Sequence, residues 1–164
     1  MSTTRYLVLD LDNTLIYARP TIEVGRLGQD EFAFRVLPNR NFYKTKVRRH
    51  VKEFLRAMIA KGYKLIVWSA GSEYYVKCIV AELFKDIDYE YVLTFNHLTN
   101  GKVKIMTTIK DMVKGIDINQ VRLLDDNRVH EPSQEKNFVY IEPFEGGQDD
   151  ALLQAIVDID RSYE

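Results

Sequence analysis

Three short runs of almost wholly apolar residues occur along the chain, and each leads into polar or acidic residues. They span residues 6–11, 64–68 and 121–124. Strands that are buried on both faces of a parallel sheet have this pattern, whereas strands with one solvated face alternate apolar and polar residues. The three runs therefore predict a parallel sheet, and we place residues 6–11 in its central strand.

Segments with helical spacing of apolar residues lie between and after these runs. Residues 47–60 carry apolar side chains at intervals of three and four, and Gly62 follows as a stop signal. Further helices are predicted at residues 73–84, 108–114 and 149–159, and further strands at residues 89–94 and 138–141. This alternation of strands and helices predicts an α/β domain with right-handed crossovers.

Residues 22–47 interrupt the alternation. Apolar and polar residues alternate at 32–36 and again at 43–47, on either side of the turn signal Pro38-Asn39-Arg40-Asn41. The pattern predicts a small β-hairpin insertion. Its basic residues at 40–49 are typical of an exposed hairpin face, although they could also guide a phosphorylated peptide or a nucleic-acid end.

The chain has a length typical of one domain, so we treat residues 1–164 as a single unit. Its 46% hydrophobic and 29% charged residues are ordinary for a globular protein, and its net charge of -1 gives no overall attraction to nucleic acid or membrane. The single cysteine, Cys78, excludes an intrachain disulfide. Without a signal peptide or a membrane-spanning run, we expect an intracellular protein, cytoplasmic or nuclear.

Two carboxylates lie where the first strand should end. Residues two apart on an extended chain point the same way, about 7 Å apart, so Asp10 and Asp12 can serve one pocket. Open parallel sheets bind ligands at the carboxyl ends of their strands. The alternative is a solvated turn in which these acids only cap backbone groups.

The other two strands end in compatible residues. Residues 64–68 run into Ser69-Ala70-Gly71, whose hydroxyl and backbone N–H groups can face an anion. Residues 121–124 run into Asp125 and Asp126, which bring two more carboxylates to the same edge. Like charges gathered there need a cation, and Mg²⁺ prefers oxygen ligands. The sequence therefore predicts a Mg²⁺ site.

These motifs resemble a known superfamily. Asp10, Asp12 and Thr14 match an Asp-x-Asp-x-Thr first motif, and Ser69 matches a Ser or Thr that follows a hydrophobic strand as a second motif. In both respects the sequence resembles the haloacid dehalogenase superfamily, and within it the FCP/SCP-type phosphatases of the RNA polymerase II C-terminal domain. The resemblance implies a three-layer α/β/α fold with the small insertion and no large cap domain.

The third and fourth motifs of that superfamily can also be placed. The segment Ile109-Lys110-Asp111-Met112 is similar to the family's lysine segment, so Lys110 is the preferred motif lysine and Lys104 the reserve. The fourth motif is an Asp followed by Asp or Asn after a hydrophobic strand, and Asp125 and Asp126 match it.

The resemblance also implies roles for these residues. Asp10 would attack phosphorus and form an aspartyl-phosphate, while Asp12 would protonate the leaving oxygen and then deprotonate a water. Asp10, the backbone carbonyl of Asp12 and Asp126 would hold Mg²⁺. The residues expected to bind phosphate or to orient those that do are Thr14, Ser69, Ala70, Lys110 and Asp125.

The subgroup resemblance favours phosphoserine or phosphothreonine in a protein or peptide as the substrate. A nucleotide, a nucleic-acid end or a small metabolite is the alternative substrate, because the same core serves all of these. A catalytically silent Tim50-like binding module is the alternative of another class. The intact Asp10 and Asp12 argue against it.

Overall fold

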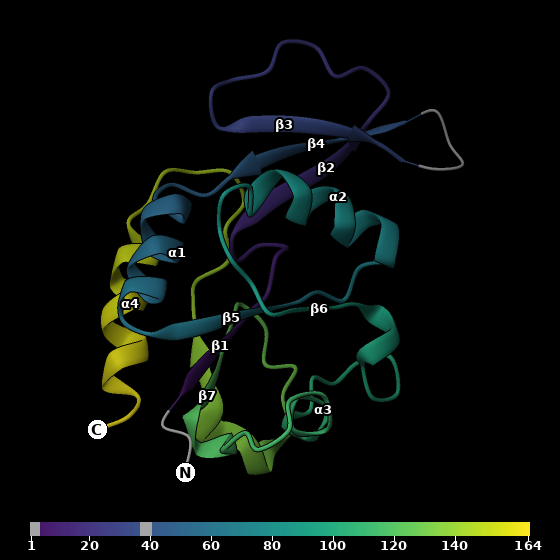
Figure 1. Cartoon of the computed structure of the whole chain (residues 1–164). Coiled ribbons are helices and arrows are strands. Elements are labelled where there is room, and N and C mark those ends of the chain that lie inside the picture. The colour runs from purple at the N-terminus through teal and green to yellow at the C-terminus, as the bar shows by residue number, and fades with distance from the viewer. Residues whose placement is uncertain (1–3, 37–40) are drawn as a thin grey trace.

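The central feature of the fold is a five-stranded parallel sheet. The computed structural model describes residues 4–36 and 41–164. The strand order is β6-β5-β1-β7-β8, with β1 in the centre (Figure 1). The strands are β1 (Arg5–Leu9), β5 (Tyr63–Trp68), β6 (Tyr91–Leu93), β7 (Val121–Asp125) and β8 (Phe138–Tyr140). The parallel sheet predicted from the three apolar runs is confirmed.

Both faces of this sheet are covered, which explains why its strands are apolar throughout. On β1, Leu7 and Leu9 pack into one core cluster while Val8 between them packs into the other. Successive side chains of a strand point to opposite faces, so a strand buried on both sides needs apolar residues at every position. The same division holds on β5, where Leu65 and Ile66 belong to different clusters.

Helices form the two outer layers. The helices α1 (Val51–Ala60), α2 (Glu73–Leu83) and α4 (Ala151–Arg161) pack on one face, and the short helix α3 (Met106–Met112) packs on the other. Figure 1 shows α1 and α4 lying side by side. The described residues also form the 3₁₀ turns η1 (Phe95–His97), η2 (Ile118–Gln120) and η3 (Pro132–Asn137). Within the described ranges, every helix is too short or too polar to cross a bilayer.

The insertion is a three-stranded antiparallel sheet, not the two-stranded hairpin expected from the sequence. Strand β4 (Phe42–Val47) lies between β2 (Ile16–Thr21) and β3 (Glu31–Arg35). The sequence pattern missed β2 because this strand contains Pro20 and lacks regular alternation, both of which an edge strand tolerates. Residues Pro38, Asn39 and Arg40 of the expected turn lie outside the described residues.

The first long helix begins later than its apolar spacing suggested. Val47, the expected first residue of the helix, is the last residue of β4. The helix α1 begins only at Val51, and His50 occupies its N-cap position with a φ of 71°. At the other end, Gly62 has a φ of 92°, a left-handed conformation that glycine adopts without steric cost and that ends the helix as expected.

Candidate active site

The candidate active site lies at the carboxyl ends of three adjacent strands. Asp10 follows β1 directly, Ser69 follows β5, and Asp125 is the last residue of β7. Because β5 and β7 both pair with β1 in parallel, these three residues emerge at the same edge of the sheet. This is where open α/β sheets bind their ligands.

The loop after β1 is a tight turn held by hydrogen bonds between buried residues. The carbonyl oxygen of Leu11 accepts hydrogen bonds from the N–H groups of Thr14, Leu15 and Ile16. Asn13 has a φ of 63°, a left-handed conformation that Asn tolerates better than most residues, and its side-chain amide donates to the carbonyl of Phe144 at 2.9 Å. The loop therefore holds its polar side chains in defined positions.

Thr14 connects two of the acids and is itself held by Arg48. The Oγ1 atom of Thr14 donates toward Oδ2 of Asp10 at 2.9 Å and toward Oδ1 of Asp126 at 3.2 Å. The buried guanidinium of Arg48 donates to the carbonyl of Thr14 at 3.1 Å and pairs with Asp149 at 2.9 Å. Arg48 therefore supports the loop from the protein interior. It is neither part of an exposed hairpin face nor placed to guide a substrate, the two interpretations given above for the basic residues at 40–49.

Three carboxylates form a compact, buried group. One oxygen each from Asp10, Asp125 and Asp126 lies within 4.8 Å of the other two. Acidic groups this close repel one another unless a cation or protons neutralise them. An all-oxygen donor set of this kind suits Mg²⁺, which keeps several waters and binds through few carboxylates. The residues present fit a divalent cation.

The same repulsion is visible in the pKa values of two of these acids. Burial and the charge of Asp10 raise the pKa of Asp125 to about 8. Burial, the hydrogen bond with Asp10 and the charge of Asp10 raise the pKa of Asp126 to about 6. Without a cation the cluster therefore favours protonated carboxyl groups, and a cation would reverse this preference.

The ammonium group of Lys104 contacts two of the three clustered acids. Its Nζ atom lies 2.7 Å from Oδ2 of Asp125 and 3.1 Å from Oδ1 of Asp10, and the side chain is almost wholly buried. Burial alone would lower the pKa of Lys104, but the charges of Asp10 and Asp125 outweigh it and raise the pKa. Lys104 thus carries its charge beside the expected nucleophile.

The structure places Lys104, and not Lys110, beside the acids. Lys110 is exposed on α3, whereas its neighbour Ile109 is the residue that packs against the sheet. The segment similar to the family's lysine motif lies inside a helix that covers the sheet, and such a helix directs Lys110 to solvent. Lys104 lies before α3, where its backbone N–H donates to the carbonyl of Val129 at 2.8 Å. That link to the chain after β7 has no signal in the local sequence.

Ser69 and Ala70 form the next part of the site. Ser69 is fully buried, and its Oγ atom accepts a hydrogen bond from the N–H of Gly71 at 3.0 Å. Accepting this bond leaves the hydroxyl proton of Ser69 free for an oxygen ligand. Ala70 lines the recess that also contains Asp10 and Asp12.

Asp12 has a partner that the sequence did not reveal. The phenol of Tyr75, on α2, donates a short hydrogen bond to Oδ1 of Asp12. Burial raises the pKa of Asp12, although this hydrogen bond acts in the opposite direction. Burial also raises the pKa of Tyr75, so its phenol stays protonated and can donate the hydrogen bond. Tyr75 lies in an ordinary amphipathic helix, so no sequence signal marked it.

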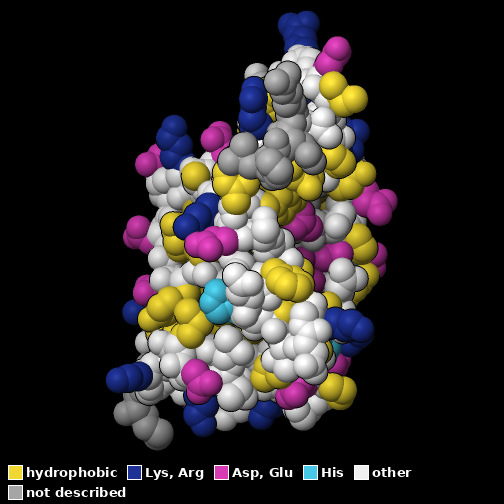
Figure 2. All heavy atoms as spheres, turned by 90° about the vertical axis from the view of Figure 1, so that its right-hand side faces the viewer, with side chains coloured by type: hydrophobic (Ala, Val, Ile, Leu, Met, Phe, Trp, Pro, Cys, Tyr) yellow, Lys and Arg dark blue, Asp and Glu magenta, His cyan; other side chains and the backbone are white. Residues whose placement is uncertain are grey.

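Asp12 and Ala70 separate two recesses of different character. One has a volume of about 120 Å³ and contains Asp10, Asp125 and Lys104. The other, which we call the aromatic cleft, has a volume of about 390 Å³. Its other lining residues are Phe34, Val36, Tyr43, Gly71, Ser72, Tyr74 and Tyr75. Figure 2 shows a face of the molecule on which acidic side chains lie among hydrophobic ones below the insertion.

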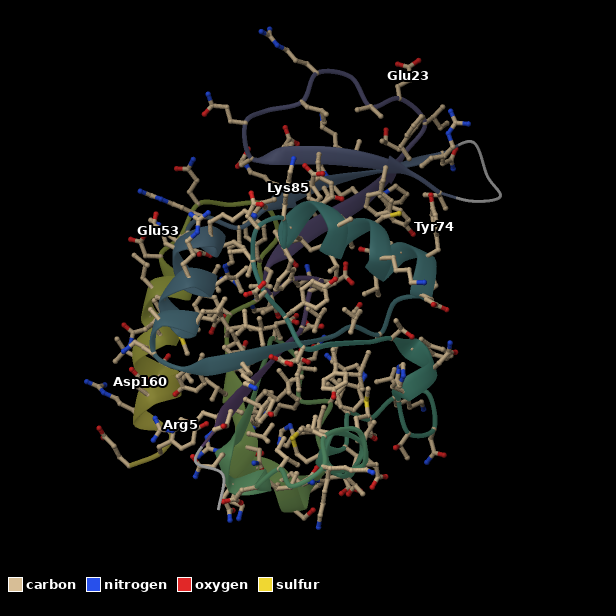
Figure 3. The ribbon with its side chains drawn as sticks, in the orientation of Figure 1. Arg5, Glu23, Glu53, Tyr74, Lys85 and Asp160 are labelled. Carbon is tan, nitrogen blue, oxygen red and sulfur yellow. The ribbon has the colours of Figure 1, made fainter. Side chains whose placement is uncertain are left out.

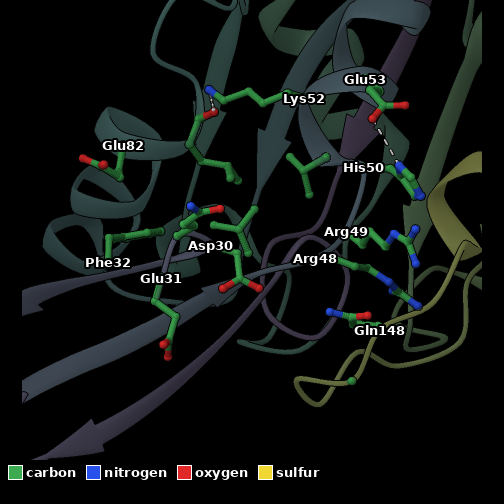
Figure 4. Close-up of a pocket in the computed structure, with 15 residues that line it drawn as sticks. Asp30, Glu31, Phe32, Arg48, Arg49, His50, Lys52, Glu53, Glu82 and Gln148 are labelled. Carbon is green, nitrogen blue, oxygen red and sulfur yellow. Dashed lines mark hydrogen bonds and ion pairs between the residues drawn. The ribbon is translucent and has the colours of Figure 1, made fainter. Parts of the chain in front are cut away.

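A larger cavity lies elsewhere. It has a volume of about 630 Å³ and lies between the insertion and the start of α1 (Figure 4). Charges of both signs line it, including Asp30, Glu82, Arg49 and Lys52. None of the clustered carboxylates lines this cavity. The volume of a cavity therefore does not identify the reactive recess, which is the small one that contains Asp10, Asp125 and Lys104.

The arrangement of these residues agrees with a match to a known family. Residues 5–162 match the sequence pattern of the NLI interacting factor-like phosphatases. The chain belongs to this phosphatase family. A viral relative supports the assignment: the CTD phosphatase-like protein 355R of Invertebrate iridescent virus 3 is 30% identical over 157 residues, covering 85% of this chain and 84% of the relative.

Other relatives of the family agree. The CTD phosphatase-like protein 355R of Invertebrate iridescent virus 6 is 27% identical over 158 residues, covering 84% of this chain and 85% of the relative. The resemblance to FCP/SCP-type phosphatases that the sequence motifs indicated is therefore confirmed.

Solved structures show the same fold. The fission yeast RNA polymerase II CTD phosphatase Fcp1, solved with bound beryllium fluoride, matches 98% of this chain with a TM-score of 0.65 and 19% identity. This chain spans only 50% of the Fcp1 chain. The cobalt-bound deoxy-D-mannose-octulosonate 8-phosphate phosphatase of Haemophilus influenzae matches 98% of this chain and 89% of its own, with a TM-score of 0.51 and 13% identity. The haloacid dehalogenase fold is thereby confirmed.

Proposed function

We propose that this domain is a Mg²⁺-dependent phosphomonoesterase that acts on phosphoserine or phosphothreonine in protein substrates. The observation that carries the proposal is the buried cluster in which Asp10 lies between one lysine and two further acids. Family membership supports phosphatase chemistry, and the aromatic cleft beside Asp12 supports a peptide substrate.

Asp10 is oriented as a nucleophile. One of its carboxylate oxygens accepts a hydrogen bond from Lys104, and the other accepts one from Thr14. In the proposed first step, an oxygen of Asp10 bonds to phosphorus while the bond from phosphorus to the serine or threonine oxygen breaks. Lys104 and the hydroxyl of Ser69 would bind the phosphoryl oxygens during the transfer.

The metal would be held by Asp10, the backbone carbonyl of Asp12 and Asp126. When bound, Mg²⁺ supplies positive charge that neutralises the phosphoryl oxygens and the clustered acids. Asp125 is the other acid of the cluster, and its ion pair with Lys104 supports a role in orienting that lysine. Lys104 and Thr14 would then hold the carboxylate of Asp10 toward the phosphorus atom.

Asp12 would serve as the acid and then as the base. Its carboxyl proton passes to the departing serine or threonine oxygen, so the alcohol leaves in neutral form. The resulting carboxylate then takes a proton from a water, whose oxygen bonds to phosphorus as the bond to Asp10 breaks. Inorganic phosphate is released, and both acids return to their starting states.

The aromatic cleft favours a peptide over a small phosphate ester. Phe34, Tyr43 and Tyr75 pack with ring centroids 4.9–5.6 Å apart and form apolar walls next to Asp12. A phosphorylated residue that reaches Asp10 would place a neighbouring side chain of its peptide in this cleft. An apolar neighbour would bury its surface there. A nucleobase also stacks on aromatic rings, so a nucleotide and an oligonucleotide are included in the test.

The test is a substrate panel assayed with metal-depleted protein to which Mg²⁺ is returned. It includes para-nitrophenyl phosphate, a nucleoside monophosphate, a 5′-phosphorylated oligonucleotide, and two phosphoserine peptides that differ only by Leu or Gly beside the phosphoserine. We expect Mg²⁺-dependent release of phosphate from the aryl ester and from both peptides. The peptide with Leu should show about tenfold higher kcat/KM than that with Gly.

Other results of this panel would point to the alternatives. Faster turnover of the nucleotide or oligonucleotide than of either peptide would replace the proposed substrate class. Absence of turnover on every compound, with Mg²⁺ bound, would identify a catalytically silent binding domain instead. Asp10→Asn protein serves as the control for contaminating phosphatases.

A further inference from the structure

We propose that Tyr75 is a positioning residue that holds the carboxyl group of Asp12 in the orientation needed for proton transfer. The proposal rests on the proposed function, because it assumes that Asp12 is the acid and base. It adds a residue outside the four sequence motifs and connects the insertion to the reactive recess.

The hydrogen bond divides the two oxygens of Asp12 between two tasks. The phenol of Tyr75 donates to Oδ1, so this oxygen is engaged. The other oxygen, Oδ2, is then the one that can carry a proton toward the leaving group. Proton transfer requires a defined short approach, and a carboxyl group free to rotate would present Oδ2 only part of the time.

The proton balance leaves Tyr75 unchanged. In the first step the proton on Oδ2 passes to the leaving oxygen of the substrate. In the second step Oδ2 accepts a proton from the attacking water. Tyr75 keeps its own proton and donates to Oδ1 in both steps, so its contribution is orientation alone.

Tyr75 is itself held from several sides. Its ring packs edge-on against Phe34 of β3 at 5.6 Å and Tyr43 of β4 at 4.9 Å. The loop that precedes α2 also approaches the ring of Tyr75 closely. A Cβ atom at Gly71 in this loop would lie 2.6 Å from a ring carbon of Tyr75. The residue that orients Asp12 is therefore positioned by strands of the insertion and by the loop after β5.

This packing couples substrate recognition to the chemistry. The ring of Tyr75 is a wall of the aromatic cleft, and its hydroxyl reaches Asp12. A side chain bound in the cleft would press on the same ring that positions the acid. Peptides that fill the cleft should therefore raise kcat as well as lower KM, since bound substrate would restrict the ring further.

The test replaces Tyr75 with Phe, which keeps the ring and removes only the hydroxyl. For a phosphoserine peptide we expect kcat to fall about tenfold, a part of the hundredfold or more that a general acid contributes, with KM within twofold. Para-nitrophenyl phosphate releases nitrophenolate, which departs without protonation. For this substrate the pre-steady-state burst rate should be unchanged. Phosphorylated Asp10 should accumulate, because the second step still needs the base.

A matched control comes from the adjacent residue. Tyr74 lines the same cleft, but its hydroxyl donates to the carbonyl of Arg35 at 2.7 Å, on the insertion side of α2 (Figure 3). Tyr74→Phe removes the same atom from the same cleft without touching Asp12. Because Tyr74 lines the cleft, any effect of this variant should appear in the KM for the phosphoserine peptide, and the leaving-group-dependent fall in kcat should be confined to Tyr75→Phe.

A double variant provides the decisive comparison. If Tyr75 acts through Asp12, adding Tyr75→Phe to Asp12→Asn should change single-turnover phosphorylation by the phosphoserine peptide less than twofold. A full tenfold loss in that background, an equal loss of the aryl ester burst, or an effect on KM alone would overturn the proposal. Absence of Mg²⁺-dependent turnover of both substrates by the unchanged protein would instead overturn the proposed function itself.

Discussion

The Nζ atom of Lys104 lies 2.7 Å from Oδ2 of Asp125, although the two residues are 21 positions apart along the chain. A buried ammonium between acids stabilises the fold and is available to bind phosphoryl oxygens. Lys104→Met should lower kcat/KM for para-nitrophenyl phosphate by at least about a hundredfold, as loss of an anion-stabilising donor does. It should also destabilise the protein by about 3–5 kcal/mol in urea denaturation, because buried acids lose their partner.

Lys110→Met is the matched control for this prediction. Lys110 is exposed on α3, so the variant should keep its activity and unfold within about 0.5 kcal/mol of the unchanged protein. Loss of activity in Lys110→Met with retention in Lys104→Met would reverse the assignment of the motif lysine.

Removing one carboxylate of the cluster should weaken Mg²⁺ binding. Asp126→Asn keeps the size of the side chain but removes a charge and an anionic ligand. Calorimetric titration of metal-depleted protein should show a dissociation constant for Mg²⁺ that is raised more than about tenfold. Loss of a residue that only hydrogen-bonds to a metal ligand raises it by roughly that amount. Asp111→Asn, an exposed acid on α3, should leave the titration unchanged. Equal Mg²⁺ affinities in the two variants would argue against Asp126 as a ligand.

The two acids of the first motif should be separable by leaving group. Asp10→Asn removes the nucleophile, so activity should vanish on every substrate. Asp12→Asn keeps the nucleophile, so an aryl phosphate should still phosphorylate Asp10 slowly, whereas phosphoserine should barely react. The aspartyl-phosphate should then accumulate, because its hydrolysis lacks a base. Mass spectrometry after rapid quench would locate the phosphate, and label on a serine or histidine would contradict this division of roles.

The raised pKa values predict that the metal-free protein loses stability as pH rises. Folding raises the pKa of Asp126 to about 6 and that of Asp125 to about 8, from near 4 in the unfolded chain. Between about pH 4 and pH 8 the folded state therefore binds more protons than the unfolded state, and the free energy of unfolding falls with increasing pH. Each kcal/mol lost should lower Tm by about 2–4 °C.

Saturating Mg²⁺ should remove most of this slope, since a bound cation favours the ionised acids at high pH. Asp126→Asn should flatten the slope between about pH 4 and pH 6 in metal-free protein. Hydrogen bonds to Glu53 and Asp150 raise the pKa of His50, so this residue also makes the free energy of unfolding fall as pH rises. The Asp126→Asn variant retains this contribution. A Tm that rises from pH 5 to pH 8 without metal would contradict the expected protonation of the cluster.

The fold was largely predictable because its signals are local. Both faces of the sheet are covered, so its strands are apolar at every position, and the helices carry apolar residues at regular intervals. The insertion was predictable only in part. Strand β2 is an edge strand that contains Pro20, and its pairing with β4 depends on residues more than twenty positions away.

The candidate site divides in the same way. Asp10, Ser69 and Asp125 directly follow or end apolar strands, and parallel strands bring such residues to one edge whatever the loops between them do. The sequence by itself therefore determined which acids meet. The lysine was different: the local sequence favoured Lys110, and only the packing of Ile109 on the sheet directed Lys110 outward.

Tertiary structure alone decided the partners of the site residues. The link between Lys104 and Val129, the support of Thr14 by Arg48 and the hydrogen bond from Tyr75 to Asp12 all join segments that are distant in the sequence. Such contacts leave no periodic pattern, because each depends on how a helix or loop packs over the sheet. The sequence determined the sheet and the acids at its edge, and packing determined which lysine and which tyrosine reach them.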